Sequence, residues 1–145
     1  MKDVPVSIQM WLSPDLGASD VCDVISVSDQ VNLTLSKASE QFNLSLTAAD
    51  GTPISGTLAT INGGSYTHVT LVYNNGKFTL YTTDGKTLDD NNVVVVNVSE
   101  AVEADLSWSD DSGNARALKI GGSGDETRSF RGNVDDIRVW TKALT

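Results

Sequence analysis

The feature that most constrains this chain is the spacing of its apolar residues, which recur at every second position. In the segment 4–12 every even-numbered residue is apolar, whereas Ser7 and Gln9 stand between them. A step of two places successive side chains on opposite faces of an extended strand, so that one face is buried and the other meets water. This spacing predicts β-strands and argues against a fold built on helices.

Two further segments, 31–36 and 42–47, repeat the alternation and are separated by the polar residues 37–41. We expect them to be successive strands of one antiparallel sheet. The segments 66–73 and 77–83 flank Asn74-Asn75-Gly76, and Asn and Gly tolerate the positive φ that tight hairpin turns require. This is the strongest local prediction of a hairpin, and Asp84-Gly85 predicts a second turn of the same chemistry.

The remaining segments complete an all-β prediction. The run 93–98 is apolar without alternation, which is typical of a strand covered on both sides. The segment 99–106, with its Ala and Glu residues, predicts one or two helical turns at most. Roughly ten short strands with turns every ~8–12 residues favour an antiparallel sandwich or barrel.

Size and charge narrow the function classes. The chain has 145 residues, 39% of them hydrophobic, which predicts a single domain spanning residues 1–145. A formal charge of −9 opposes contact with nucleic acid or an anionic membrane surface. No apolar run approaches the ~18 residues of a membrane-spanning helix, and the first residues lack the apolar core of a signal peptide.

The chain has one cysteine and one histidine. Cys22 cannot form a disulfide within the chain, and its apolar surroundings at 21–25 predict a buried, inert thiol. A Ser-His-Asp triad could use only His68. Because His68 falls inside a strand pattern, we expect a structural side chain that is hydrogen-bonded at the rim of the core.

Three blocks of the sequence follow one another in a recognisable order. The first is 6–14, in which alternating apolar residues lead to Trp and Pro; the second is the hairpin 66–85; the third joins 118–122 to 130–144. Together they resemble the laminin G-like and pentraxin-like domains of the concanavalin A-like lectin/glucanase superfamily. The resemblance implies a jelly roll, an antiparallel β-sandwich of two sheets.

The chain departs from that family in two ways. Tyr66 stands where the family usually has Trp. Family members also usually carry another strand before the first block and a further segment after the last. A sandwich without its leading strand exposes unpaired backbone groups along an edge. We therefore expect a protein partner, or further copies of the chain, to bind through edge strands and termini.

The family also contains glucanases, which need two carboxylates on one face, roughly 5–10 Å apart. Their motif alternates Glu, Asp and Glu along one strand, and nothing in this sequence matches it. Glu103 and Asp105 are two residues apart but fall in the ambiguous segment 99–106. Asp135 and Asp136 are adjacent, so in a strand they point to opposite faces. The sequence therefore predicts that the chain is not an enzyme.

Acidic residues concentrate in the last third of the chain, where residues 89–136 hold eleven of them against four basic residues. Calcium takes six to eight oxygen ligands, and the resemblance implies that end loops are where it would bind. Asp110 and Asp111 are the candidate calcium ligands, and a solvated turn is the alternative interpretation. We expect no required cofactor, with calcium as the one candidate.

Sugar binding usually needs an exposed aromatic ring beside amides and carboxylates. We expect the aromatic residues on strand faces to pack in the core; these are Trp11, Phe42, Tyr73, Phe78, Tyr81, Phe130 and Trp140. Trp108 is the exception, because it lies between two serines just before an acidic turn. The candidate glycan-binding residues are Trp108, Asp110, Asn114 and Asp125.

Two functions remain open. The first is a non-catalytic interaction or structural module that docks on a larger assembly, such as a virion capsid or tail or a cell-surface layer, on the virion or cell exterior. The acidic surface, the absent disulfides and the absent catalytic groups favour it. The second is a lectin-like module that binds a glycan, with calcium assisting.

Overall fold

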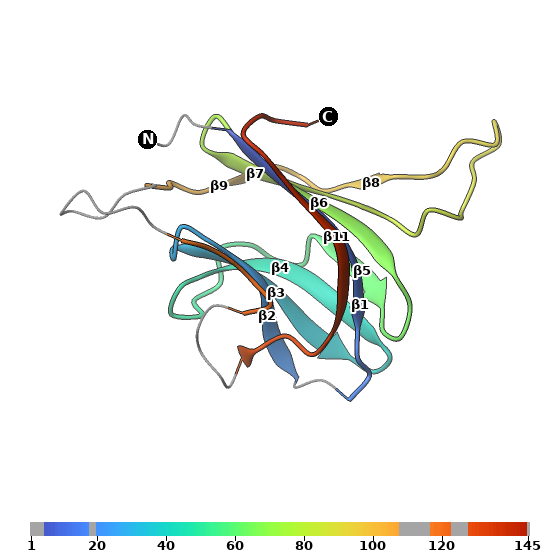
Figure 1. Cartoon of the computed structure of the whole chain (residues 1–145), viewed down its shortest axis with the longest axis horizontal. Helices are drawn as coiled ribbons and strands as arrows, with labels where there is room; N and C mark the ends of the chain where they lie inside the picture. Colours follow the sequence, from blue (N-terminus) through green and yellow to red (C-terminus); the bar gives the residue numbers. More distant parts are fainter. Residues whose placement is uncertain (1–4, 18–19, 108–116, 123–127, 145) are drawn as a thin grey trace.

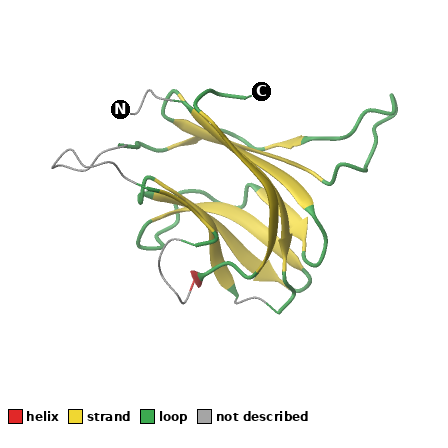
Figure 2. Ribbon diagram, viewed as in Figure 1, coloured by secondary structure: helices red, strands yellow, loops and turns green. Residues whose placement is uncertain are grey.

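The computed structural model describes residues 5–17, 20–107, 117–122 and 128–144. Figure 1 shows two sheets stacked face to face, and Figure 2 shows that strands make up nearly all of the regular structure. The strands are β1 (Val6–Pro14), β2 (Val21–Val27), β3 (Val31–Ala38), β4 (Gln41–Ala48), β5 (Ala59–Asn62), β6 (Thr67–Asn74), β7 (Lys77–Thr83), β8 (Asn97–Val98), β9 (Val102–Glu103), β10 (Leu118–Ile120) and β11 (Gly132–Trp140).

Every pairing between these strands is antiparallel. One sheet has six strands in the order β11-β1-β6-β7-β8, with β9 also paired to β7. The other has five strands in the order β10-β2-β3-β4-β5. The predicted all-β, two-sheet antiparallel sandwich is therefore confirmed, and it is consistent with a concanavalin A-like jelly roll.

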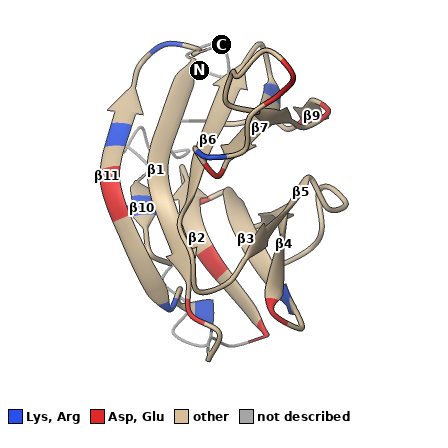
Figure 3. Ribbon diagram, turned by 90° about the vertical axis from the view of Figure 1, so that its right-hand side faces the viewer, with Lys and Arg blue, Asp and Glu red and all other residues tan. Residues whose placement is uncertain are grey.

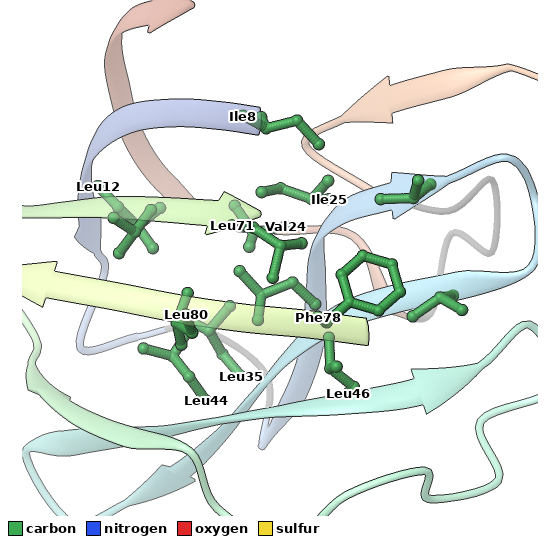
Figure 4. Packing of buried hydrophobic residues seen from close by; sticks show 14 of the residues in the cluster. Ile8, Leu12, Val24, Ile25, Leu35, Leu44, Leu46, Leu71, Phe78 and Leu80 are labelled. Atoms are coloured by element: carbon green, nitrogen blue, oxygen red, sulfur yellow. The ribbon is translucent and has the colours of Figure 1, made fainter. Parts of the chain in front are cut away.

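The core lies between the two sheets and is built from the alternating apolar faces. On β1, Ile8, Met10 and Leu12 have no solvent exposure. Figure 4 shows Ile8 and Leu12 in the same packed cluster as the leucines of β3 and β4. Each fully buried side chain of this size contributes roughly 1.5–3 kcal/mol of transfer free energy. The step-two spacing of the sequence thus becomes the inner face of each sheet.

Turn chemistry is where the sequence is most informative. β6 and β7 are joined by Asn75 and Gly76, whose φ values are 53° and 74°. Positive φ at both central residues gives the twist that a tight two-residue hairpin requires. The predicted hairpin is confirmed, as is the antiparallel pairing of β3 with β4, which only Ser39 and Glu40 separate.

The Cys22 side chain is fully buried on the inner face of β2. Burial raises the pKa of its thiol to about 11, because the thiolate would lose its hydration. The prediction of a buried thiol is confirmed, and its inertness stays a prediction that the raised pKa supports.

A charged residue is buried on the outer face of the five-stranded sheet. Asp23 of β2 has no solvent exposure. Arg128 donates hydrogen bonds to both oxygens of the Asp23 carboxylate, from Nε at 3.0 Å and from Nη2 at 2.9 Å. The Thr34 hydroxyl donates a third hydrogen bond to Asp23 at 2.8 Å. This bidentate pair ties the segment before β11 to the opposite sheet.

Two expectations for the segment between β7 and β10 are wrong. The run 93–98 is not covered on both sides, since Val94, Val96 and Val98 are 38%, 50% and 60% exposed. The segment 99–106 forms no helical turn; it contains β9, which pairs with Lys77 and Phe78. The run 93–98 is the returning half of a long hairpin at the edge of the six-stranded sheet, where the opposite sheet covers little of it. The segment 99–106 is extended because it pairs with β7, and it brings Val102 and Leu106 to the core.

We expect Arg128→Ala to lower the free energy of unfolding by about 3–5 kcal/mol, because it leaves the Asp23 carboxylate buried without its cation. The melting temperature should fall by roughly 10 °C for a chain of this length. The control is Arg138→Ala, since Arg138 and Asp136 form an ion pair whose side chains are 57% and 52% exposed. That variant should lose less than about 1 kcal/mol. Equal losses in urea unfolding of the two variants would contradict a structural role for the buried pair.

Candidate binding surface

The outer face of the six-stranded sheet gathers the aromatic and amide side chains that the core leaves out. Gln9 and Trp11 of β1 alternate with buried core residues and therefore point away from the sandwich. The strand register sets Trp11 opposite His68 and Gln9 opposite Thr70. Thr70 is in turn opposite Tyr81 of β7, so that these side chains form one continuous patch.

A groove of about 210 Å³ runs across this patch, and we call it the outer-face groove. Its walls come from β1, β6 and β7, from the residue Val96 before β8 and from the segment after β11. The lining residues are Gln9, His68, Thr70, Tyr81, Thr82, Thr83, Val96 and Leu144.

Contacts among neighbouring side chains fix the shape of the groove. The Trp140 indole N–H donates to the Gln9 amide oxygen at 2.9 Å, which orients the amide. The Trp11 and His68 rings meet edge to face with their centroids 5.0 Å apart. Gly85 has a φ of +71°, and a Cβ at that position would lie 2.8 Å from Trp11 Cη2. Only glycine lets the turn lie this close to the indole.

His68 differs from its predicted environment. It lies on the outer face of β6 and lines the groove rather than the rim of the core, and no hydrogen bond of its ring is found among the described residues. Burial lowers the pKa of His68, because the charged imidazolium loses hydration; nearby Asp136 partly opposes the effect. The imidazole is therefore neutral at pH 7 and offers one donor and one acceptor.

The segment after β11 closes one end of the groove. The Ser7 hydroxyl donates to the Lys142 carbonyl at 2.7 Å and accepts from the Leu144 N–H at 3.0 Å. The Lys142 ammonium lies 5.3 Å from the centroid of the Trp140 ring. Leu144 is thereby held over the outer face of the sheet.

Residues 84–96 form a projection that we call the arm, which Figure 1 shows extending away from both sheets. At its base the Asp84 carboxylate accepts hydrogen bonds from the backbone N–H groups of Lys86 and Thr87 and from the Thr87 hydroxyl. These bonds lower the pKa of Asp84 to about 2. At its tip Asp89 accepts from the N–H groups of Asn91 and Val93. The arm is thus a defined hairpin with capped turns.

Four aliphatic side chains form a continuous row along the arm and β8. Leu88 pairs directly with Val94, and Val98 pairs directly with Tyr81, so that each pair shares a face of the hairpin. Val96 lines the outer-face groove beside Tyr81, whereas Val95 lines a polar groove on the opposite side. The row, which we call the outer-face strip, comprises Leu88, Val94, Val96 and Val98, and these are 53%, 38%, 50% and 60% exposed.

None of the site residues proposed from the sequence can be compared with this surface. Trp108, Asp110, Asp111, Asn114 and Asp125 all lie outside the described residues. In the part of the chain that the structure describes, no three His, Cys, Asp or Glu side chains come together to hold a metal ion.

The expectation for the strand aromatics is right in part. Phe42, Tyr73 and Phe78 are fully buried in the core, and Phe130 packs against it. Trp11, Tyr81 and Trp140 are half-buried on the outer face instead, which corrects the prediction. Alternation with buried neighbours was the available signal for Trp11, because Met10 and Leu12 on either side of it already fill the inner face.

The acidic residues considered for a glucanase-type pair lie far apart in the sheet. Glu103 lies on β9, whereas Asp135 lies opposite Trp11 on β11 at the other edge of the sheet. Asp136 has a φ of 51°, at a bulge in the pairing of β11 with β1, and its carboxylate binds Arg138.

Comparison with protein families agrees with this geometry. The model of the concanavalin A-like lectin/glucanases superfamily, Laminin_G_3, matches residues 1–145. The chain belongs to this family. Laminin G-like domains are generally non-catalytic binding modules, although the superfamily includes glucanases. No curated protein matches the chain. Among its described residues there is no helix with the length and apolar character needed to span a bilayer.

We expect Gly85→Ala to destabilise the protein by about 1–3 kcal/mol more than Gly76→Ala. Both glycines have a positive φ, 71° and 74°, but a Cβ would meet nothing within 4 Å at Gly76 and would meet Trp11 at Gly85. Gly76→Ala therefore isolates the backbone strain. Urea unfolding of both variants measures the difference, and equal losses would show that the contact with Gly85 does not position Trp11.

Proposed function

We propose that the chain is a non-catalytic interaction module that docks on a larger assembly through the outer-face strip. The observation that carries the proposal is the row of four exposed aliphatic side chains on one face of the arm and β8. Contiguous exposed apolar surface on a soluble protein commonly marks a surface that binds another molecule.

The strip has no evident role in folding. Its four residues are absent from the hydrophobic core, and all of them retain more than a third of their exposure. The turns at the base and tip of the arm are nevertheless shaped by the bonds to Asp84 and Asp89. A projection with defined turns that contributes little to the core is suited to contact with a partner.

The surface chemistry supports a proposal for the kind of assembly. The chain carries a net charge of −9 and cannot form a disulfide by itself, and most of its exposed large apolar residues lie on the arm, β8 and β11. A virion capsid or tail, or a cell-surface layer, fits such a module, and we therefore propose a location on the virion or cell exterior. Docking in this sense requires no cofactor.

A glycan-binding role is the second candidate, and the outer-face groove is the observation that favours it. The groove presents the His68 and Tyr81 rings beside the Gln9 amide, and its volume of about 210 Å³ is enough for a small unit such as one sugar ring. A glycan array would test this role. Tyr81→Ala should abolish a sugar signal, and Thr79→Ala, on the same face of β7 but outside the groove, should preserve it. Calcium assistance stays a prediction for Asp110 and Asp111.

Docking is tested by placing a photo-crosslinking amino acid at Val94 or, as a control, at Gly56, which lies in a loop of the five-stranded sheet with open space around it. We expect the Val94 protein to form a discrete adduct with a component of its native assembly, and the Gly56 protein to form none. Mass spectrometry of the irradiated assembly gives the readout. Equal yields at both positions, or none at either, would contradict docking through the strip.

A further inference from the structure

We infer that the extended segment 93–98, which ends in β8, binds a segment of a partner protein by strand addition, and that the partner segment alternates apolar residues with Lys or Arg. The inference rests on the proposed docking function and specifies its binding mode and its partner. It follows from the backbone, the side chains and the charge of the arm.

The backbone of the segment 93–98 forms hydrogen bonds along one edge only. The Val95 N–H donates to the Thr87 carbonyl and the Ser99 N–H to the Leu80 carbonyl, so the odd-numbered residues face the neighbouring strand. Backbone groups alternate in direction along a strand, which turns those of Val94, Val96 and Val98 to the free edge. Among the described residues, none forms a hydrogen bond with the backbone of Val94 or Val96. A free ladder of this kind is the template for an added strand.

The same three valines supply the side-chain contacts. They belong to the outer-face strip, and their side chains recur at every second residue on one face of the hairpin. An added strand sets its own alternate side chains beside them, about 5 Å away. Apolar residues at those positions of the partner would cover the strip.

The acidic residues near the strip indicate which charged residues the partner segment carries. Residues 84–105 contain six acidic side chains and only one basic one, Lys86. The six acids are Asp84, Asp89, Asp90, Glu100, Glu103 and Asp105. In Figure 3 the ribbon is coloured red, for Asp and Glu, near β9. Lys or Arg residues in the partner would complement them, whereas a second copy of this chain, with its charge of −9, would bring acids against acids.

The other edge of the sheet provides an internal comparison. β11 has a bulge at Asp136, and it carries Asp135, Asp136 and Arg138 on its exposed surface. Bulges and charged side chains are the usual means of preventing edge-to-edge pairing. The segment 93–98 has the sequence Val-Val-Val-Val-Asn-Val, with neither charge nor proline. One edge of the sheet is therefore protected and the other is open.

The test uses four nine-residue peptides as probes of the intact chain. One alternates Lys with Val, one Lys with Ser and one Glu with Val; the fourth is the Lys/Val peptide with every second amide N-methylated. We expect only the unmodified Lys/Val peptide to slow hydrogen exchange at the amides of Val94, Val96 and Val98, by about tenfold or more. Added salt should weaken its binding, because part of the attraction is between exposed charges.

Two matched variants separate the strip from its surroundings. Val96→Thr replaces one methyl group of the strip with a hydroxyl, and we expect it to weaken Lys/Val peptide binding by about fivefold. Val93→Thr makes the same change at a residue that is 58% exposed but lies outside the strip, and it should leave binding unchanged. Threonine is β-branched like valine, so both variants should keep the strand.

Several outcomes would overturn the inference. If the Lys/Ser peptide binds as tightly as the Lys/Val peptide, the apolar strip makes no contribution to binding. If the Glu/Val peptide binds as tightly, the charge of the partner segment has no role, and binding of the N-methylated peptide would exclude strand addition. If the amides of Val94, Val96 and Val98 are already protected in a dimer of the chain, the edge binds a second copy instead. If Val94 still forms its adduct while no peptide slows exchange, the inference fails and the docking function stands; if the adduct is also absent, both fail.

Discussion

The constraint on which the structure depends is the two-residue period of the strand. Because Ile8, Met10 and Leu12 fill the core, Gln9 and Trp11 must lie on the outer face. A slip of one residue in the pairing of β1 with β6 would expose the core face of β1 and bury its outer face, at a cost of many kcal/mol. The outer-face groove therefore takes its geometry from the core beneath it, although it shares almost no side chains with that core.

The buried Asp23–Arg128 pair fixes the position of the last strand of the chain, β11. Desolvation makes such a pair a weak source of net stability, but its two-pronged geometry specifies one arrangement. Arg128 lies four residues before β11, so the pair restrains the approach of β11 to the edge of the six-stranded sheet. β11 then supplies Trp140, whose indole orients Gln9 at the groove. The ion pair on the five-stranded sheet thus influences the shape of the outer-face groove on the six-stranded sheet.

Where the sequence predicts well, the determining interactions are local. Asn75-Gly76 specifies its own turn, and the alternation in 31–36 and 42–47 specifies which face is buried. The prediction fails for 93–98, because an uninterrupted apolar run has the same appearance whether two sheets cover it or none does. A position on a strand face predicts core packing for Trp11, Tyr81 and Trp140, but their alternation with buried neighbours places them on the outer face. The Asp23–Arg128 pair joins residues 105 positions apart, and no local pattern reveals such a contact.

The acidity of the chain and its open strand edge are best understood together. An uncharged valine-rich edge would ordinarily lead identical molecules to pair with one another. The charge of −9, with six acids close to that edge in the sequence, opposes this self-association while leaving the backbone ladder accessible. The same acids attract a segment of opposite charge. One distribution of charge can therefore disfavour the wrong partner and favour the right one, so the edge itself needs no bulge, proline or lysine to remain selective.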